Sequence, residues 1–242
     1  MPSKITLEIE DKCLPPFFVK QKVSIEKGEG VYVWDEEGKM YIDFTSGWGM
    51  TCIGHANPVI TDALLNQGRK IIQNPNSGLT YSPARARLLS LFEGILPPNL
   101  TRVFFTNCGA EANDAAIKLA CKVTGRPDII STYQSFHGRT ISTTSATGQA
   151  KHRDRYNPLM PNYRFVPYND IEALKRSLDD NVAAVIIEPI QGEGGGVCIP
   201  SEGYLKEADI LCKNNGSLLI MDEIQTGFFR TGPAFVTGSC GV

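Results

Sequence analysis

The sequence predicts an α/β fold built on a mostly parallel sheet. Short apolar runs without polar alternation, such as 184–187 and 218–221, are typical of strands that are buried on both faces of such a sheet. Segments with helical spacing lie between the runs, and the order strand, helix, strand indicates crossover units in a doubly wound sheet. With 242 residues, of which 42% are hydrophobic, the chain is long enough to bury a sizeable core.

The N-terminal part predicts a β-hairpin followed by a helix. Residues 31–34 and 40–44 have the composition of two strands, and the turn 35–38 between them ends in a glycine. A stretch rich in glycine and serine follows at 46–55, and a helical segment is expected near 58–72.

From about residue 84 the pattern changes to alternating helices and strands. We expect strands at 103–106, 129–133, 184–188 and 218–222, and helices at 110–123, 171–178 and 203–213. In the first of these helices the side chains with i, i+3, i+4 spacing are expected to form the buried face, namely Ala112, Ala115, Ala116, Leu119, Ala120 and Val123.

Charge and hydropathy exclude several classes of partner. The formal net charge is −2, and without a basic run we expect no nucleic-acid partner. The apolar runs are too short to span a bilayer, so we expect no membrane association. Residues 1–12 are charged and lack the apolar stretch of a signal peptide, which predicts a cytoplasmic protein.

Cysteine and histidine usage predicts no metal site and no disulfide framework. The seven cysteines are odd in number and form no CxxC pair, so we interpret them as small buried side chains in a reducing compartment. The three histidines have no metal-ligand spacing among themselves or with cysteine.

The end of the strand 103–106 predicts an anion site. Asn107, Cys108 and Gly109 lead directly into a helix, whose first N–H groups are unpaired and positively polarised. Phosphate is the most plausible partner. The alternative is a plain strand–helix turn in which Glu111 only complements the helix dipole.

Two other strands end in acidic residues, Glu188 and Asp222. A carboxylate at the end of a buried strand requires a cation, a metal or good hydrogen-bond donors. Because no metal-ligand cluster accompanies this pair, an organic cation or a protonated ring nitrogen is the favoured partner. The alternative is a structural salt bridge to an arginine or lysine elsewhere.

The strand 129–133 leads into Phe136 and Arg139, which could place a ring-stacking surface beside a carboxylate clamp. The alternative is a packed loop aromatic beside a solvated arginine. The glycine run 192–196 has neither the P-loop ending nor GxGxxG spacing, which disfavours nucleotide binding.

Four motifs in order resemble the class III (fold-type I) pyridoxal-phosphate aminotransferases. They are TNCGAEANDAAIKLA, SFHGRT, EPIQGEGG and DEIQTGFFRTG, and the similarity extends from about Gly28 to Val242. The stretch 147–174 is most similar to acetylornithine and ornithine aminotransferases, with 4-aminobutyrate enzymes as close relatives. The resemblance implies the fold-type I sheet and pyridoxal 5′-phosphate as cofactor.

The resemblance also implies roles at the cofactor. Backbone N–H groups of Gly109 and Ala110 would bind its phosphate. Phe136 would stack on one face of the pyridine ring and Ile224 would pack on the other. Asp222 would keep the ring nitrogen protonated, so that the ring can accept electrons when a carbanion forms.

The resemblance implies further roles at the cofactor ring and at the substrate. Gln225 would donate a hydrogen bond to the phenolic oxygen of the ring, with Glu188 behind it as support. Arg139 would clamp the α-carboxylate of an amino acid or 2-oxoacid. Trp48 matches a substrate-gating position, and Glu193 matches a switch residue that pairs with an arginine when the substrate side chain has no carboxylate.

The implied reaction moves an amino group from an ω-amino donor, such as acetylornithine, ornithine or 4-aminobutyrate, to a 2-oxoacid such as 2-oxoglutarate. The implied assembly is a homodimer with its active sites at the interface. Residues 1–57 would contribute to the small domain and the substrate gate, and 58–242 would form an incomplete cofactor-binding large domain. Racemases, aminomutases and decarboxylases of the same fold remain alternatives.

The chain departs from the family pattern in two places. Cys108 stands where serine or threonine is usual, which we expect to be tolerated because backbone groups hold the phosphate. The family's Schiff-base lysine lies beyond the position of Val242, and the last lysine here is Lys213. That lysine anchors the cofactor and shuttles a proton, so we expect the 242-residue chain alone to be inactive. A natural truncated isoform that binds the cofactor or a full-length subunit is the alternative.

Overall fold

The computed structural model describes residues 4–75, 78–194 and 196–242. The chain forms two compact units, Met1–Pro83 and Ala84–Val242. The first is a small α+β unit and the second an α/β unit, and each has its own sheet. The division of the chain at residue 57 by function stays a prediction.

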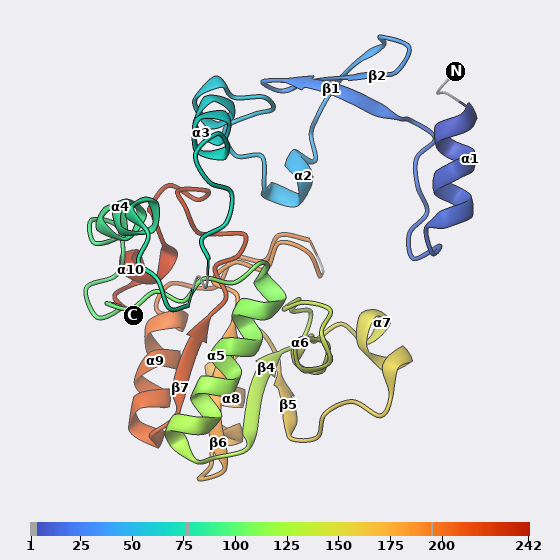
Figure 1. Cartoon of the computed structure of the whole chain (residues 1–242). Helices are drawn as coiled ribbons and strands as arrows, with labels where there is room; N and C mark the ends of the chain where they lie inside the picture. Colours follow the sequence, from blue (N-terminus) through green and yellow to red (C-terminus); the bar gives the residue numbers. More distant parts are fainter. Residues whose placement is uncertain (1–3, 76–77, 195) are drawn as a thin grey trace. The chain divides into compact units, whose positions relative to one another are not determined.

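The first unit contains a three-stranded antiparallel sheet. Strands β1 (Ile25–Glu29), β2 (Tyr32–Asp35) and β3 (Met40–Ile42) pair in that order (Figure 1). The turn between β2 and β3 is held by Asp35, whose carboxylate accepts a hydrogen bond from the Lys39 amide at 2.9 Å. The predicted hairpin is therefore confirmed, and β1 is an additional strand that the sequence analysis missed.

Among the described residues of the first unit, three segments form helices. They are α1 (Lys4–Cys13), α2 (Ser46–Gly49) and α3 (Pro58–Gly68). Asn57 caps α3 by accepting a hydrogen bond from the Val59 amide at 3.0 Å. The helix expected near 58–72 thus begins where predicted and ends four residues earlier, at Gly68.

The second unit contains a four-stranded sheet in which all strands are parallel. Its order is β5-β4-β6-β7 (Figure 1), with β4 at Asp128–Thr132, β5 at Tyr163–Val166, β6 at Val182–Ile187 and β7 at Leu218–Met221. The α/β class and three of the predicted strands are confirmed. β5 was missed because its sequence, YRFV, is short and carries a charged residue.

The predicted strand at 103–106 is wrong, because this segment forms no strand. Its Phe104 is 79% exposed. Apolar composition gives a segment strand propensity, but a strand also needs a neighbour for its backbone hydrogen bonds. Among the described residues, no strand pairs with 103–106, and β7 is bonded to β6 on one side only.

The helices of the second unit alternate with its strands. The three predicted helices are confirmed within a few residues at each end. The observed helices are α4 (Pro83–Phe92), α5 (Gly109–Thr124), α6 (Ile141–Ala146), α7 (Ala150–Arg153), a 3₁₀ turn (Asp154–Tyr156), α8 (Ile171–Ser177), α9 (Tyr204–Asn215) and α10 (Val236–Cys240).

The predicted buried face of α5 is wrong in part. Asn113, Ile117 and Ala120 are buried, whereas Leu119 and Val123 are 59% and 66% exposed. The helix is rich in alanine, whose small side chain is accommodated on both the buried and the exposed face of a helix. Its hydrophobic pattern therefore marks the buried face only weakly, and the inward polar residue Asn113 was not expected.

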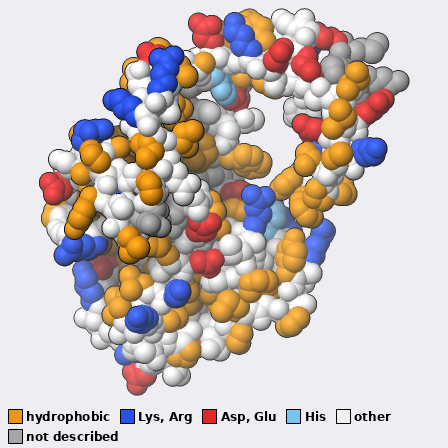
Figure 2. All heavy atoms as spheres, in the orientation of Figure 1, with side chains coloured by type: hydrophobic (Ala, Val, Ile, Leu, Met, Phe, Trp, Pro, Cys, Tyr) orange, Lys and Arg blue, Asp and Glu red, His pale blue; other side chains and the backbone are white. Residues whose placement is uncertain are grey.

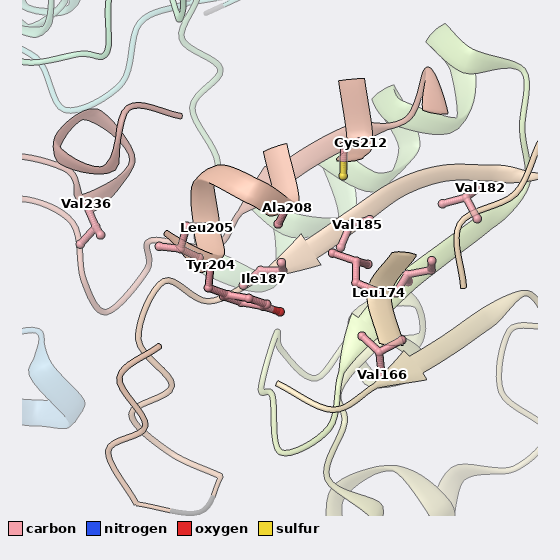
Figure 3. Close-up of a cluster of buried hydrophobic side chains, with 11 residues drawn as sticks. Val166, Leu174, Val182, Val185, Ile187, Tyr204, Leu205, Ala208, Cys212 and Val236 are labelled. Carbon is pink, nitrogen blue, oxygen red and sulfur yellow. The ribbon is translucent and has the colours of Figure 1, made fainter. Parts of the chain in front are cut away.

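Helices cover the sheet on both faces (Figure 1). α5 packs on one face over Ile129, Ala184 and Ile186. The second core lies on the side of α8 and α9 and contains Val185 and Ile187 (Figure 3). Successive residues of β6 alternate between the two cores, and the alternation slips once at Ala183, where the register with β4 shifts.

The surface of the chain carries charges of both signs and exposed apolar side chains. On the face that Figure 2 shows, basic and acidic side chains are interspersed over several elements, in keeping with the net charge of −2. Within 4–75, 78–194 and 196–242, no helix has both the length and the apolar character needed to cross a bilayer.

Two glycines allow close backbone approach beside β4. A Cβ atom on Gly148 would lie 2.0 Å from the Thr132 carbonyl oxygen, and one on Gly194 would lie 1.8 Å from that of Gln134. The loops that contain 148 and 194 therefore lie directly against the chain that leaves β4. Only glycine fits at these positions.

We expect Gly148→Ala to lower the free energy of unfolding by about 1–3 kcal/mol or more, because the backbone must shift to relieve the overlap. Chemical denaturation measures the change. Gly238→Ala in α10 is the matched control, since its new Cβ would meet no atom nearer than 3.9 Å. An unchanged Gly148→Ala midpoint would contradict the close approach.

Candidate functional site

The site lies at the carboxyl ends of β6 and β7, where parallel α/β sheets bind their ligands. Glu188 follows β6 and Asp222 follows β7. The Asp222 amide donates to the Ile187 carbonyl at 2.8 Å, which continues the parallel ladder by one residue. Both carboxylates are buried, with 7% and 6% exposure.

Asp222 is surrounded by hydrogen-bond donors. Its Oδ2 accepts from Nδ1 of His137 at 2.7 Å and from Nδ2 of Asn113 at 2.8 Å. Its Oδ1 accepts from the Ile224 amide at 3.2 Å. The structural salt bridge to arginine or lysine, considered above, is absent: among the described residues the one ion-pair partner of Asp222 is His137.

The sequence analysis missed Asn113 and His137 as site residues. Both are almost fully buried, at 5% and 2% exposure. Asn113 could have been noticed as a polar residue one helical turn after the predicted anion site. His137 could have been noticed because it lies between Phe136 and Gly138 in the loop after β4.

Glu188 is held by the loop after β4, which also carries His137. Its Oε2 accepts a hydrogen bond from the Phe136 amide at 3.0 Å. Burial raises the pKa of Glu188 to about 7, the Phe136 N–H opposes this, and the nearby carboxylates of Asp222 and Glu193 add to it. This edge of the sheet thus brings Glu188 close to two other carboxylates, and the pKa of Glu188 lies near neutral pH.

The N-terminus of α5 presents unpaired amides. Among the described residues, the N–H groups of Gly109 and Ala110 have no acceptor, and the N-cap residue Cys108 makes no capping bond. Glu111 instead folds back to accept from Asn107, at 2.8 Å from its amide and 2.9 Å from its side chain. The amides therefore remain available to an anion.

Neighbouring loops pack against this N-terminus. A Cβ on Gly109 would lie 2.9 Å from Cγ1 of Ile224, and one on Gly138 would lie 2.6 Å from Cβ of Ala110. The chain after β7 and the chain after β4 therefore both contact the first turn of α5. Gln225 follows Ile224, and its Oε1 would lie 2.5 Å from a Cβ on Gly192.

Glu193 has one partner on α7 and one at its N-cap. Gln149 donates to its Oε2, and Nε2 of His152 lies 3.5 Å from its Oε1. The ring of His152 also packs edge-on against Phe136, with centroids 5.8 Å apart. The resemblance implies an arginine partner for Glu193. Within the described part of the chain, its ion-pair partner is His152.

The structure gives fewer contacts for the remaining predicted site residues. Phe136 is half-buried and Arg139, three residues on, is exposed. Trp48 belongs to the first unit and is 76% exposed. Gly195 of the motif EPIQGEGG lies outside the described residues. The substrate roles of Trp48, Arg139 and Glu193 stay predictions.

The residues at the strand ends fit a phosphorylated pyridine cofactor. The unpaired amides at 109 and 110 are suited to a phosphate group, and the Asp222 carboxylate is suited to a protonated ring nitrogen. An aromatic and a branched aliphatic side chain, Phe136 and Ile224, are available for the two faces of a ring. A metal is not required by these groups.

The family model of the class III aminotransferases matches residues 18–242. The chain therefore belongs to this family. A similar curated relative is the acetylornithine aminotransferase of Methanothermobacter thermautotrophicus, which is 44% identical over 242 residues. That match covers 100% of this chain and 61% of the relative.

Solved structures of related enzymes share the fold. The taurine:2-oxoglutarate aminotransferase of Bifidobacterium kashiwanohense has a TM-score of 0.91 at 31% identity, covering 100% of this chain and 60% of that one. The ornithine aminotransferase of Toxoplasma gondii ME49 has a TM-score of 0.87 at 33% identity, covering 98% and 57%. The chain thus spans about 60% of the length of these relatives.

The raised pKa of Glu188 predicts a pH-dependent stability. Its folded-state pKa of about 7 lies above the ordinary value of 4.5, so the folded chain binds more protons than the unfolded chain between these values. The stabilisation is complete below pH 4.5 and is lost as pH rises through 7. We expect Glu188→Gln to gain stability over the wild type, by on the order of 2 kcal/mol between about pH 5 and pH 8.

Denaturant titrations of both proteins across this pH range measure the difference. Glu202→Gln, which removes an exposed carboxylate from the same unit, is the control. A Glu188→Gln advantage that does not change with pH would show that Glu188 is ionised throughout.

Proposed function

We propose that this chain is the cofactor-binding part of a pyridoxal-phosphate-dependent transaminase of the acetylornithine and ornithine type. Such an enzyme moves the amino group of an ω-amino donor to a 2-oxoacid such as 2-oxoglutarate. The observation that carries the proposal is the buried Asp222 beside the unpaired amides of α5. The family membership and the 44% identity to an acetylornithine aminotransferase support it.

The cofactor supplies an electron-withdrawing ring that stabilises negative charge on the substrate carbon. Gly109 and Ala110 would donate their amides to its phosphate, where the N-terminal end of the α5 dipole adds favourable charge. Phe136 and Ile224 would hold the ring between them. Asp222 would accept the hydrogen of the ring nitrogen, and Gln225 would donate to the phenolic oxygen. The solved structure of the Bifidobacterium relative is a complex with pyridoxal phosphate and glutamate.

Substrate recognition would use charged residues near the same strand ends. Arg139 can bind an α-carboxylate through two parallel N–H groups. Glu193 has its carboxylate fixed between Gln149 and His152, where it can repel or attract the distal group of a substrate. Trp48 would limit access from the first unit. The choice of donor among acetylornithine, ornithine and 4-aminobutyrate depends on residues outside these three.

The complete enzyme is further proposed to be a cytoplasmic homodimer in which residues 1–57 contribute to the substrate gate. Because the chain covers 61% of its Methanothermobacter relative, the catalytic lysine is expected in the part that it does not cover. The chain alone would then bind the cofactor without turnover. A truncated isoform that binds a full-length subunit is the second candidate.

The 242-residue chain should bind pyridoxamine 5′-phosphate, because the amine form of the cofactor needs no lysine for attachment. We expect Asp222→Asn to weaken this binding by about 10- to 100-fold, since a hydrogen bond to an ionised partner is lost. Isothermal titration calorimetry measures the affinity. Asp209→Asn is the control, because Asp209 is a buried carboxylate of the same unit that pairs with Lys213 instead. Equal affinity of the wild type and Asp222→Asn would exclude the proposed cofactor site.

The intact mass of the native protein separates the two candidates. A mass clearly above 26.5 kDa would predict transamination by the purified native protein, assayed with each of the three amino donors and 2-oxoglutarate. A native mass of 26.5 kDa would favour the truncated isoform. Sustained turnover by a protein of that mass would contradict the assignment of the lysine to a missing segment.

A further inference from the structure

The carboxylates at this edge of the sheet are paired with histidines. Burial raises the pKa of Glu188 to about 7, and the nearby carboxylates of Asp222 and Glu193 add to the increase. A further negative charge brought to this edge is therefore repelled. Among the residues that the structure describes, the ion-pair partners here are His137 beside Asp222 and His152 beside Glu193.

Glu193 is held in place by the N-cap residue of α7. Gln149 is buried and donates from Nε2 to Oε2 of Glu193. The same nitrogen donates to the Ser135 carbonyl oxygen at 3.4 Å. A Cβ atom on Gly194 would lie 2.9 Å from this nitrogen. The loop that carries Glu193 therefore lies directly on Gln149, and the carboxylate is kept close to α7.

His152 faces Glu193 without a hydrogen bond. Its Nε2 lies 3.5 Å from Oε1 of Glu193, and the two side chains are 41% and 21% exposed. This nitrogen is itself buried and has no hydrogen-bond partner within 4–75, 78–194 and 196–242. The interaction is therefore electrostatic and acts only while the imidazole is protonated. Such a partly exposed pair contributes little to stability, and its main effect is on the field that a charged ligand meets.

The pair lies beside the aromatic side chain that is proposed to stack on the cofactor. The imidazole of His152 packs edge-on against Phe136, with ring centroids 5.8 Å apart and an interplanar angle of 74°. Under the proposed function, Phe136 covers one face of the cofactor ring. Charges act over about 8 Å at physiological ionic strength. The charges of His152 and Glu193 can therefore act on a substrate that is joined to the cofactor.

We propose that His152 offsets the charge of Glu193 and thereby admits substrates that carry a second carboxylate, such as a dicarboxylic 2-oxoacid. The inference rests on the proposed function, because it requires the cofactor ring at Phe136. Without the positive charge of the imidazole, Glu193 would repel a distal carboxylate and attract a distal ammonium group. His152 is thus a specificity-determining residue that acts through Glu193. Gln149 is a positioning residue that keeps the carboxylate beside the imidazole.

Three ligands that differ in their distal charge test the proposal on the 242-residue chain. They are the N-(5′-phosphopyridoxyl) derivatives of the α-amino groups of glutamate, glutamine and ornithine, which end in a carboxylate, an amide and an ammonium group. None of them needs a lysine for attachment. Isothermal titration calorimetry at pH 6 and low salt measures the affinities, because the imidazole must be protonated to carry its charge and salt screens that charge.

His152→Gln removes the charge and keeps a polar side chain. We expect it to weaken binding of the glutamate derivative by about tenfold, to strengthen binding of the ornithine derivative and to leave the glutamine derivative unchanged, because the lost charge acts with opposite sign on the two charged ligands. His152→Lys keeps a positive charge and should retain the wild-type order of affinities. Lys151→Gln is the matched control, since it removes a positive charge from an exposed neighbouring position of α7 and should change none of the three affinities.

Glu193→Gln provides a second test with the opposite sign, which also serves if His152→Gln does not fold. It removes the repelling charge and should strengthen binding of the glutamate derivative by about tenfold while weakening that of the ornithine derivative. In the double variant neither charge remains. Both affinities should therefore return close to the wild-type values, which a double-mutant cycle measures as a coupling between the two residues.

The possible failures separate the two proposals. If the wild-type chain binds neither pyridoxamine 5′-phosphate nor the three derivatives, the proposed function and this inference are both overturned. If it binds pyridoxamine 5′-phosphate and none of the derivatives, the inference alone is overturned. The same holds if the derivatives bind and the His152 and Glu193 variants change all three affinities equally or not at all, since His152 would then only pack against Phe136.

Discussion

A carboxylate buried at the end of a strand has to be surrounded by hydrogen-bond donors, because isolated negative charge in the interior is very costly. In this chain the donors to Asp222 come from α5, from the loop after β4 and from the residue two positions further on. These three segments must therefore reach one point for the sheet to fold around this carboxylate. The requirement ties the helix that presents free amides to the loop that carries Phe136.

The sequence predicted most of the elements that create this point. β4, β6 and β7 were recognised because parallel strands buried on both faces consist of continuous apolar residues, and β6 is buried at all six positions. The segment 103–106 has the same composition and was wrongly predicted, since pairing with a neighbour is a long-range property that composition does not contain. β5 was missed for the opposite reason. Arg164 interrupts its apolar pattern, yet the strand forms because β4 is available as a pairing partner.

Site residues were predicted where residue type and position in the sequence indicate a function. They were missed where their role depends on side-chain packing. Glu188 and Asp222 were found because an acid directly after a buried strand is conspicuous. Asn113 was missed because the alanines around it suggested a different buried face of α5. His137 was missed because its neighbour Phe136 has a more obvious use. Which of two adjacent side chains points inward depends on the loop conformation, and residue types alone do not determine that conformation.

The same tertiary constraints give Glu188 fewer hydrogen-bond donors than Asp222. Asp222 has two side-chain donors on a single oxygen, whereas Glu188 has one backbone donor, the Phe136 amide. With fewer donors and with Asp222 and Glu193 close by, burial raises the pKa of Glu188 to about 7. One loop thus supplies a strong donor to Asp222 and a weaker one to Glu188 from consecutive residues. A shift of this loop would alter both carboxylates together, and the close contacts of Gly148 and Gly194 with the chain after β4 restrict such a shift.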